Sequence, residues 1–247
     1  MPTLSYQLYT SRNWPLNDTL DMIERVGFEA VEGFGPLFDD PIATRAMLDA
    51  RELTMPTAHF AFDLVANDPT RALEIARTLG VQSVIVPWIA PEQRPTDKAG
   101  WEAFAKKLAE AGKPIRDAGL GYGWHNHDFE FLPCADGTLG IEALAAQPEI
   151  GFELDLGWIH VAGQDPADWV SRYADRLLAV HIKDRAPEGE NADEGGWADL
   201  GYGEVDYTHI VPALGDTDVE IWVLEHDNPS DHERFATRSF NALSMFV

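Results

Sequence analysis

The sequence predicts an α/β protein with a single domain, residues 1–247, folded as a (β/α)8 barrel. The first observation behind this prediction is a regular alternation of short apolar segments with longer segments of helical periodicity. The second is that no Gly/Ser-rich linker and no abrupt change in composition divides the chain. The chain has 247 residues, of which 45% are hydrophobic, and this is enough for the core of one such barrel.

Eight segments are predicted to be strands, because each is a short run of mainly apolar residues. They comprise residues 4–9, 28–34, 54–60, 81–88, 120–126, 150–156, 177–183 and 219–226. One helix is predicted after each strand, from apolar residues spaced three or four apart. The helices comprise residues 17–27, 39–52, 68–80, 96–119, 138–147, 165–175, 206–215 and 230–246. In the first helix, Asn17 or Asp18 is the expected N-cap and Gly27 is the expected stop.

The formal net charge of −24 comes from 42 acidic and 18 basic residues. Because binding to a polyanion depends on clusters of Lys and Arg, we expect neither nucleic acid nor an anionic membrane as a partner. The chain has no run of about 18 apolar residues and no secretory signal pattern, so a cytoplasmic protein is expected. The single cysteine, Cys134, has no second cysteine with which to form a disulfide or a zinc pair.

The longest irregular segment, residues 186–207, follows the seventh predicted strand. In a barrel this segment lies over the face at which the strands end. Trp197, Gly201 and Gly203 favour a folded lid, whereas the many acidic residues leave a disordered surface loop as the alternative.

Residues able to bind a metal or transfer a proton occur near the ends of six predicted strands. They are Glu32, His59, the segment HNHDFE at residues 125–130, Asp155, His181 and Glu225. One histidine at a strand end is usually structural. However, the active sites of (β/α)8 barrels collect at this end of the strands, so the six positions are expected to converge in a ring.

A ring of carboxylates and imidazoles suits one divalent cation, Mn, Mg, Co or Zn, and the lack of cysteine ligands argues against a structural zinc site. Such a cation can bind a hydroxyl and an adjacent carbonyl. It would stabilise the negative charge that develops when the C–H between these groups is deprotonated. The residues therefore predict enediolate chemistry on a sugar.

The chain also resembles a known family over nearly its whole length. The resemblance rests on the motifs WHNHDFEF, ELDLGW followed by AGQDP, VHIKDR, LGYGEVDY and VLEHD, in that order and spacing. These resemble the sugar phosphate isomerase/epimerase group of xylose isomerase-like TIM barrels. They are similar in particular to the branch that includes inosose dehydratases and enzymes acting on 3-keto-sugars. Together the motifs are specific for the superfamily, but they do not identify a substrate.

The resemblance implies one divalent metal ion held by groups from strands five to eight. Asp155, His181 and Glu225 match the aspartate, the histidine and the last glutamate of the family pattern. Many relatives have a glutamate where this chain has His125, so Glu130 is expected to supply the missing carboxylate from the following loop. His125 is then either the alternative ligand or a contact of the substrate.

Several residues beside the expected metal are candidates for catalysis. Lys183 lies two residues beyond the metal-binding histidine and so on the same face of an extended strand. Its amine can stabilise an oxyanion or donate a proton, although a solvated lysine paired with Asp184 is the alternative. His125, His127 and Glu130 are further candidates for proton transfer.

The expected substrate contacts are Glu32, His59, Trp88, Trp158 and Arg185. The tryptophan rings can cover a sugar ring, but they can equally pack helices on the barrel. Glu32 and His59 can instead bond to nearby backbone, and Arg185 can form a surface ion pair. The small number of cations near the mouth favours a neutral keto-sugar or an inositol-like polyol over a sugar phosphate.

The predicted function is that of a metal-dependent sugar isomerase or epimerase, which transfers a proton next to a carbonyl. A lyase or dehydratase, which expels a β-hydroxyl or a glycosyl group from the same enediolate, is the first alternative. A sugar-binding barrel protein without enzymatic activity is the second. The expected partner is a small carbohydrate, and the sequence leaves open whether the chain forms a homo-oligomer.

Overall fold

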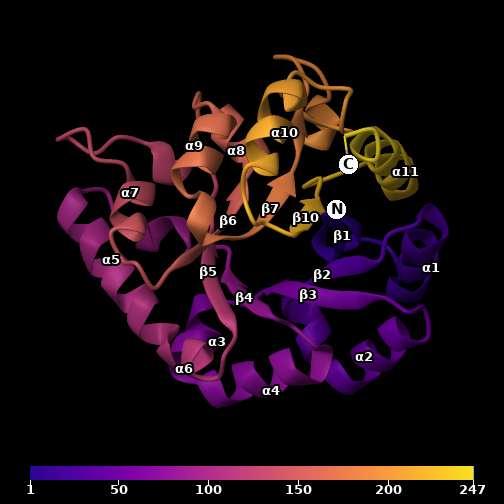
Figure 1. Cartoon of the computed structure of the whole chain (residues 1–247), viewed down its shortest axis with the longest axis horizontal. Coiled ribbons are helices and arrows are strands. Elements are labelled where there is room, and N and C mark those ends of the chain that lie inside the picture. Colours follow the sequence, from indigo (N-terminus) through magenta and orange to yellow (C-terminus); the bar gives the residue numbers. More distant parts are fainter. Residues whose placement is uncertain (247) are drawn as a thin grey trace.

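The computed structural model describes residues 1–246 and shows a closed barrel of parallel strands (Figure 1). The barrel strands are β1 (Thr3–Gln7), β2 (Ala30–Phe34), β3 (Thr54–His59), β4 (Ser83–Val86), β5 (Gly121–His125), β6 (Gly151–Asp155), β7 (Leu177–Ile182) and β10 (Ile221–Leu224). Each strand pairs with the barrel strand next along the chain, and β10 closes the barrel against β1. The predicted (β/α)8 fold and its eight strands are confirmed, while residue 247 of the predicted domain lies outside the described residues.

Helices surround the strands on the outside of the barrel (Figure 1). They are α1 (Leu16–Val26), α2 (Pro41–Asp49), α3 (Phe62–Asn67), α4 (Pro69–Leu79), α5 (Lys98–Ala111), α6 (Lys113–Asp117), α7 (Gly140–Ala145), α8 (Leu156–Val161), α9 (Pro166–Arg172), α10 (Tyr207–Gly215) and α11 (His232–Leu243). All eight predicted helices are present, although the segment 96–119 is divided at Gly112 into α5 and α6. The short helices α3 and α8 were not predicted.

The ends of α1 illustrate one wrong and one correct prediction. The helix begins at Leu16 after Pro15, so neither Asn17 nor Asp18 is the N-cap. Proline fits this position because its fixed φ suits the entry to a helix. Gly27 ends the helix as predicted, with φ at 111°, a left-handed conformation that glycine adopts without a steric penalty.

The strands place polar side chains inside the barrel and apolar side chains against the helices, because successive residues of a strand point to opposite faces. On β6, Phe152 and Leu154 belong to the hydrophobic core. Glu153 and Asp155 alternate with them and are also fully buried. Glu153 contacts His181 of β7 together with residues of β3 and β5, so its side chain lies in the barrel interior. The interior is therefore lined by ionisable groups at the level of the strand ends.

The long segment after β7 is folded. It contains β8 (Asp184–Arg185) and β9 (Trp197–Ala198), which pair antiparallel. The Asp184 carboxylate accepts hydrogen bonds from the backbone N–H groups of Arg185, Gly201, Gly203 and Val205. A Cβ added at Gly203 would lie 2.2 Å from this carboxylate, so the close approach requires glycine. Residues 186–207 thus form an ordered segment, as the folded alternative predicted.

The acidic residues are partly explained by the helix ends. Aspartates cap several helices by accepting a hydrogen bond from the first turn, namely Asp40, Asp68, Asp97, Asp155, Asp165, Asp206 and Asp231.

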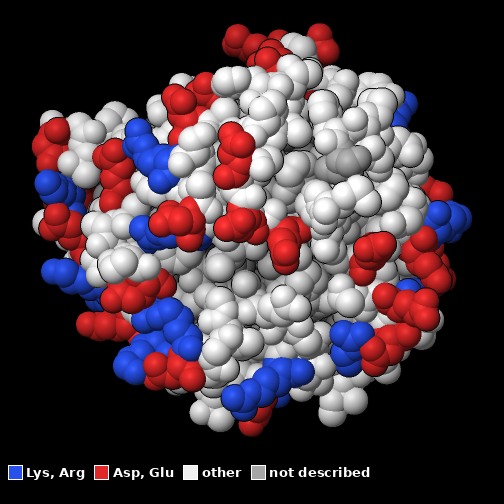
Figure 2. All heavy atoms as spheres, in the orientation of Figure 1, with Lys and Arg blue, Asp and Glu red and all other residues white. Residues whose placement is uncertain are grey.

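On the face shown in Figure 2, acidic residues are interspersed with basic ones, and this face carries no continuous basic patch. Within residues 1–246, no helix is both long and apolar enough to cross a membrane.

Candidate metal centre

Four strands bring four potential metal ligands together at the carboxyl-terminal end of the barrel. His125 is the last residue of β5, Asp155 is the last residue of β6, His181 lies in β7 and Glu225 follows β10. One ligand atom from each residue lies within 4.8 Å of the others, and all four side chains are buried. We call these residues the outer group. Their nitrogen and oxygen donors are those that divalent transition metals bind.

Asp155 has one carboxylate oxygen available for a cation. Its Oδ1 accepts a hydrogen bond from the backbone N–H of Trp158 at 2.8 Å and thereby caps α8. Its Oδ2 is buried and has no hydrogen-bond partner within the described chain. Because a buried polar atom without a partner costs about 1–3 kcal/mol, this oxygen fits a cation bound by the outer group.

Asn126 fixes the ends of β5 and β6 relative to each other. Its side-chain oxygen accepts a hydrogen bond from the backbone N–H of Asp155 at 3.0 Å, and its amide group donates to the Asp155 carbonyl at 3.3 Å. Since His125 directly precedes Asn126, these bonds also fix the position of His125 relative to Asp155. The asparagine between the two histidines of the HNHDFE segment is therefore a structural part of the centre.

Lys183 places a positive charge beside the outer group. Its amine lies 3.5 Å from Asp155 Oδ2, 3.2 Å from Glu225 Oε2 and 3.0 Å from Asp227 Oδ2. Burial raises the pKa of Asp155 to about 7. Burial also opposes ionisation of Glu225, but Lys183 and His181 outweigh it and hold the pKa of that carboxyl well below its usual range. One lysine cannot balance all these carboxylates, so the charges also fit a divalent cation.

A second group of ionisable residues lies beside the first. Glu153 precedes Asp155 by two residues on β6, so it points to the same face but lies further into the barrel. Its Oε2 lies 2.6 Å from His59 Nε2, 3.0 Å from His125 Nδ1 and 3.3 Å from His181 Nε2. We call His59, His125, Glu153 and His181 the inner group, whose ligand atoms also lie within 4.8 Å of one another.

Glu32 of β2 extends the inner group. Its Oε1 lies 2.7 Å from His181 Nε2 and 3.0 Å from His59 Nε2, and it accepts a hydrogen bond from the Gln7 amide at 2.6 Å. Burial alone would lower the pKa of His59, but the charges of Glu32 and Glu153 outweigh it and raise that pKa to about 10. A protonated His59 therefore offsets the charge of the two carboxylates between which it lies.

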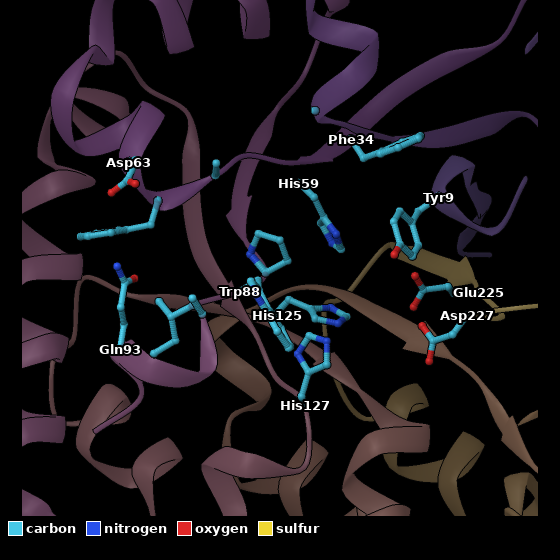
Figure 3. A pocket seen from close by; sticks show the side chains of 16 residues that line it. Tyr9, Phe34, His59, Asp63, Trp88, Gln93, His125, His127, Glu225 and Asp227 are labelled. Carbon is cyan, nitrogen blue, oxygen red and sulfur yellow. The ribbon is translucent and has the colours of Figure 1, made fainter. Parts of the chain in front are cut away.

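A cavity of about 650 Å³ opens beside the outer group (Figure 3). His59, His125, Glu225 and Asp227 line its polar side. Its other walls are mainly apolar and aromatic, and they include Tyr9, Phe34, Ala61, Phe62, Pro87, Trp88, Ile89 and Ala90. The volume lies within the range of about 300–1,000 Å³ that is usual for pockets that bind small molecules.

Glu130 lies outside both groups, contrary to the expectation that it reaches the metal. Its Oε1 accepts a hydrogen bond from the Trp124 indole at 2.7 Å, and its Oε2 accepts one from the backbone N–H of His127 at 2.9 Å. Burial raises the pKa of Glu130 to about 8. Both oxygens thus stabilise the loop after β5, and the position next to the other ligands is taken by His125.

Two predicted residues of the cavity wall are His127 and Trp88. Their rings contact each other edge to face, with centroids 5.1 Å apart. The Nδ1 atom of His127 is buried and has no hydrogen-bond partner in residues 1–246. Burial lowers the pKa of His127 to about 3, so the imidazole is neutral near pH 7. Arg94 lies 4.2 Å from the ring centroid of Trp88 and supports this ring.

Other predicted contacts lie behind the cavity wall. Lys183 is buried, and its amine lies 5.2 Å from the ring centroid of Trp158 and 4.1 Å from that of Trp197. A Cβ added at Gly157 would lie 2.7 Å from the Lys183 Cβ, so glycine permits this packing. Arg185 contacts the long loop instead of the cavity: it donates to the Gly195 carbonyl at 2.8 Å, and its guanidinium lies over Trp197.

Three residues of the centre were not identified from the sequence: Asn126, Glu153 and Asp227. Glu153 lies two residues before Asp155, and Asp227 lies two residues after Glu225. The two-residue alternation of extended chain places such pairs on one face, so this signal would have pointed to both acids. No comparable sequence signal distinguishes the structural role of Asn126, which fixes the ends of β5 and β6, from the role of a metal ligand or a substrate contact.

Comparisons with known proteins identify the family of this barrel. The family model described as "Xylose isomerase-like TIM barrel" matches residues 20–243. An inosose dehydratase of Lacticaseibacillus casei is 21% identical over 236 residues, which cover 83% of this chain and 79% of that protein.

Two solved structures share the fold. A sugar phosphate isomerase/epimerase from Parabacteroides distasonis superposes with a TM-score of 0.81 at 20% identity, covering 98% of this chain and 93% of that chain. The IOLI protein with a bound zinc atom superposes with a TM-score of 0.73 at 16% identity, covering 100% of this chain and 96% of that chain. The sequence match and the closed barrel lead to one conclusion: the chain belongs to the xylose isomerase-like TIM barrel family.

Proposed function

We propose that this protein is a divalent-metal-dependent enzyme that transfers a proton next to the carbonyl of a keto-sugar or a related polyol, as an isomerase or epimerase does. The observation that carries the proposal is the outer group, a buried set of two histidines and two carboxylates beside an open cavity. Relatives named as sugar phosphate isomerase/epimerase and inosose dehydratase support an enzyme of this class.

The proposed ligands are His125, Asp155, His181 and Glu225, with His125 in the place that the sequence assigned to Glu130. Asp155 Oδ2, which accepts no hydrogen bond within residues 1–246, supports this set, as does the IOLI structure, which binds zinc. Mn, Mg, Co and Zn all remain candidates, because mixed nitrogen and oxygen donors suit each of them to some degree. When bound, the ion supplies a Lewis acid that stabilises negative charge developing on a substrate oxygen.

His127 is the proposed proton acceptor. It lines the cavity and its Nδ1 carries no other hydrogen bond within the described residues, whereas the burial that lowers its pKa to about 3 weakens its affinity for a proton. Asp227, which lines the cavity from the chain after β10, is the proposed second group for proton transfer. Two groups from different strands would allow a proton to be removed at one position and returned at another.

Lys183 is proposed to act through charge. Its amine is enclosed by Trp158 and Trp197 and does not line the cavity, so direct donation of a proton to substrate has less support. It remains within 3.5 Å of the carboxylates of Asp155, Glu225 and Asp227. A positive charge at this distance favours the ionised form of these carboxylates, against the burial that raises the pKa of Asp155 and Asp227, and it favours an oxyanion nearby.

The cavity supports an uncharged substrate. Among residues 1–246, no lysine or arginine lines it, and Arg185, expected to contact substrate, lies on the long loop instead. Aromatic walls such as Trp88 and Phe34 suit the apolar faces of a sugar ring. His59 and His127 are proposed to bind its hydroxyls, because both residues line the cavity.

The proposal is tested by proton NMR in D2O with the Mn- or Mg-loaded protein and a panel of ketoses, inososes and 3-keto-glucosides. We expect metal-dependent deuterium incorporation at a carbon next to the carbonyl of at least one compound. A protein that holds one metal ion per chain but exchanges no proton in any of these compounds would contradict the proposed reaction and favour a sugar-binding role.

A lyase is the second candidate, and the apolar part of the cavity favours it. Phe62, Ile89 and Ala90 belong to the lining and offer an apolar surface to a leaving group. In the NMR experiment, an unsaturated product or a released aglycone would identify a lyase. An epimer or an aldose–ketose pair would identify an epimerase or isomerase.

A further inference from the structure

The two histidines of the outer group also belong to the inner group, and each uses a different ring nitrogen in each group. His125 faces Asp155 with Nε2 and Glu153 with Nδ1. His181 faces Glu225 with Nδ1 and Glu153 with Nε2. Each imidazole thus lies between a carboxylate of the outer group and the single carboxylate of Glu153.

This geometry limits how the two groups can be used together. A neutral imidazole has one nitrogen that donates a proton and one nitrogen with a lone pair, and only the latter binds a metal. When His125 and His181 bind an ion through the nitrogens that face the outer group, their other nitrogens must carry N–H groups. Those N–H groups then need acceptors, because both side chains are buried.

The carboxylate of Glu153 faces both histidines, and its side chain is fully buried. Its Oε2 is hydrogen-bonded to His125 Nδ1 at 3.0 Å and lies 3.3 Å from His181 Nε2. Glu32 is the hydrogen-bond partner of the same His181 nitrogen, at 2.7 Å. His59 bonds to both carboxylates and, when protonated, reduces their mutual repulsion.

The outer group is the better metal site of the two. His125 and Glu225 line the cavity, so an ion held there can meet a substrate. The carboxylate of Glu153 does not line the cavity, and Oε2 of Glu153 already faces three imidazole nitrogens. A second ion in the inner group would require His125 and His181 to bind metal through both nitrogens at once.

We propose that Glu153, assisted by Glu32, is a positioning residue that fixes the tautomer and orientation of both histidine ligands. The inference rests on the metal site of the proposed function and adds to it a residue that touches neither the ion nor the substrate. A carboxylate behind a histidine ligand raises the basicity of that ligand, and its loss typically weakens metal binding about 10–100-fold. Here one carboxylate serves two ligands.

The test compares Co²⁺ affinity, measured by competition with a chelator, in the wild-type protein and in Glu153→Gln. A glutamine keeps the size of the side chain and one acceptor oxygen, but it removes the negative charge that both imidazoles face. We expect affinity to fall about 10–100-fold, with one ion bound per chain. Glu32→Gln should have a smaller effect, because among the proposed ligands Glu32 contacts His181 alone.

Glu130→Gln is the matched control, since Glu130 is also a fully buried glutamate but bonds only to Trp124 and His127. We expect its Co²⁺ affinity to equal that of the wild type. The visible absorption of bound Co²⁺ is a second measurement. The spectrum reports the geometry of the ligands. We expect it to change in Glu153→Gln but not in Glu130→Gln. A general loss of stability would not change the spectrum of the bound ion.

The outcomes separate the inference from the proposed function. No metal binding by the wild-type protein would overturn both. One bound ion, with equal affinity and spectrum in wild type and Glu153→Gln, would overturn the inference alone. Two bound ions per wild-type chain would also overturn it, since Glu153 would then be a ligand. If Glu153→Gln fails to fold, the spectrum and affinity of Glu32→Gln decide, and unchanged values would contradict the positioning role.

Discussion

The two halves of the barrel contribute different chemistry to the same cavity. Strands β5, β6, β7 and β10 carry the four residues of the outer group at or next to their carboxyl ends. Strands β1 to β4 and the loops that follow them supply most of the apolar wall, including Phe34 and Trp88. The ligands lie on or next to paired strands, whereas the wall lies mainly on loops. If the outer group binds the proposed ion, its geometry is set by the sheet, while the proposed recognition of substrate depends on segments that can vary without disturbing the sheet.

The largest effect is expected from Asp155→Asn. Asparagine can still cap α8 by accepting the hydrogen bond from Trp158, but it replaces the charged ligand oxygen by a neutral amide. We expect metal binding and proton exchange to fall below detection while the protein remains folded, as measured by metal analysis and circular dichroism. Asp165→Asn, which makes the same change at the cap of α9, should retain the metal. If Asp155→Asn held as much metal as the wild type, the assignment of the metal ligands to strands β5, β6, β7 and β10 would be wrong.

Lys183→Met should strongly destabilise the metal-free protein. The substitution leaves Asp155, Glu225 and Asp227 without their common cation, and removing one partner of a buried ion pair typically costs about 3–5 kcal/mol. Urea unfolding should show this loss, and added metal should recover part of it. Lys113→Met removes a lysine from an exposed pair with Asp117 and should cost about 0–1 kcal/mol. Similar losses in the two variants would contradict the role of Lys183.

Trp88→Ala tests the half of the barrel that forms the wall. The substitution removes an aromatic surface of the cavity that Arg94 supports from one side. We expect KM for the substrate to rise about tenfold, equivalent to about 1.4 kcal/mol, with the metal affinity unchanged. Steady-state kinetics and the Co²⁺ competition measurement provide both values. A fall in metal affinity would show that the two halves are not separate in function.

Arg185→Gln is expected to have the smallest effect. The guanidinium contacts the Gly195 carbonyl and the Trp197 ring, and it does not line the cavity. KM should therefore change by less than about twofold, as is usual for substitutions away from a site. A large rise in KM with an uncharged sugar would show that Arg185 contacts the substrate. The long loop after β7 would then take part in substrate recognition together with the wall formed by β1 to β4 and their loops.

Much of the fold was predictable, because each strand is an apolar run and each helix follows it with its own periodicity. The convergence of Asp155, His181 and Glu225 followed from their positions at strand ends, and the structure brings them together. Glu130 shows the limit of this reasoning. A motif gives the order of residues, but the short 3-10 turn at Phe129–Phe131 carries Glu130 back towards Trp124 instead of towards the other acids.

The rest of the site depends on contacts between distant segments. The wall combines residues from the loops after several strands, and no local pattern specifies which of their side chains meet. Glu153 was missed for a different reason. The alternation of side chains along β6 predicts that Glu153 points into the barrel. Its role could not be predicted, because it depends on three histidines from β3, β5 and β7 that meet only in the folded barrel.

Anomalous diffraction from crystals of the Mn²⁺- or Co²⁺-loaded protein tests the central claim most directly. We predict one ion per chain, bound by His125 Nε2, Asp155 Oδ2, His181 Nδ1 and Glu225, with Glu153 on the far side of both imidazoles. An ion bound by Glu130, or an ion bound between His59 and Glu153, would contradict this account of the centre.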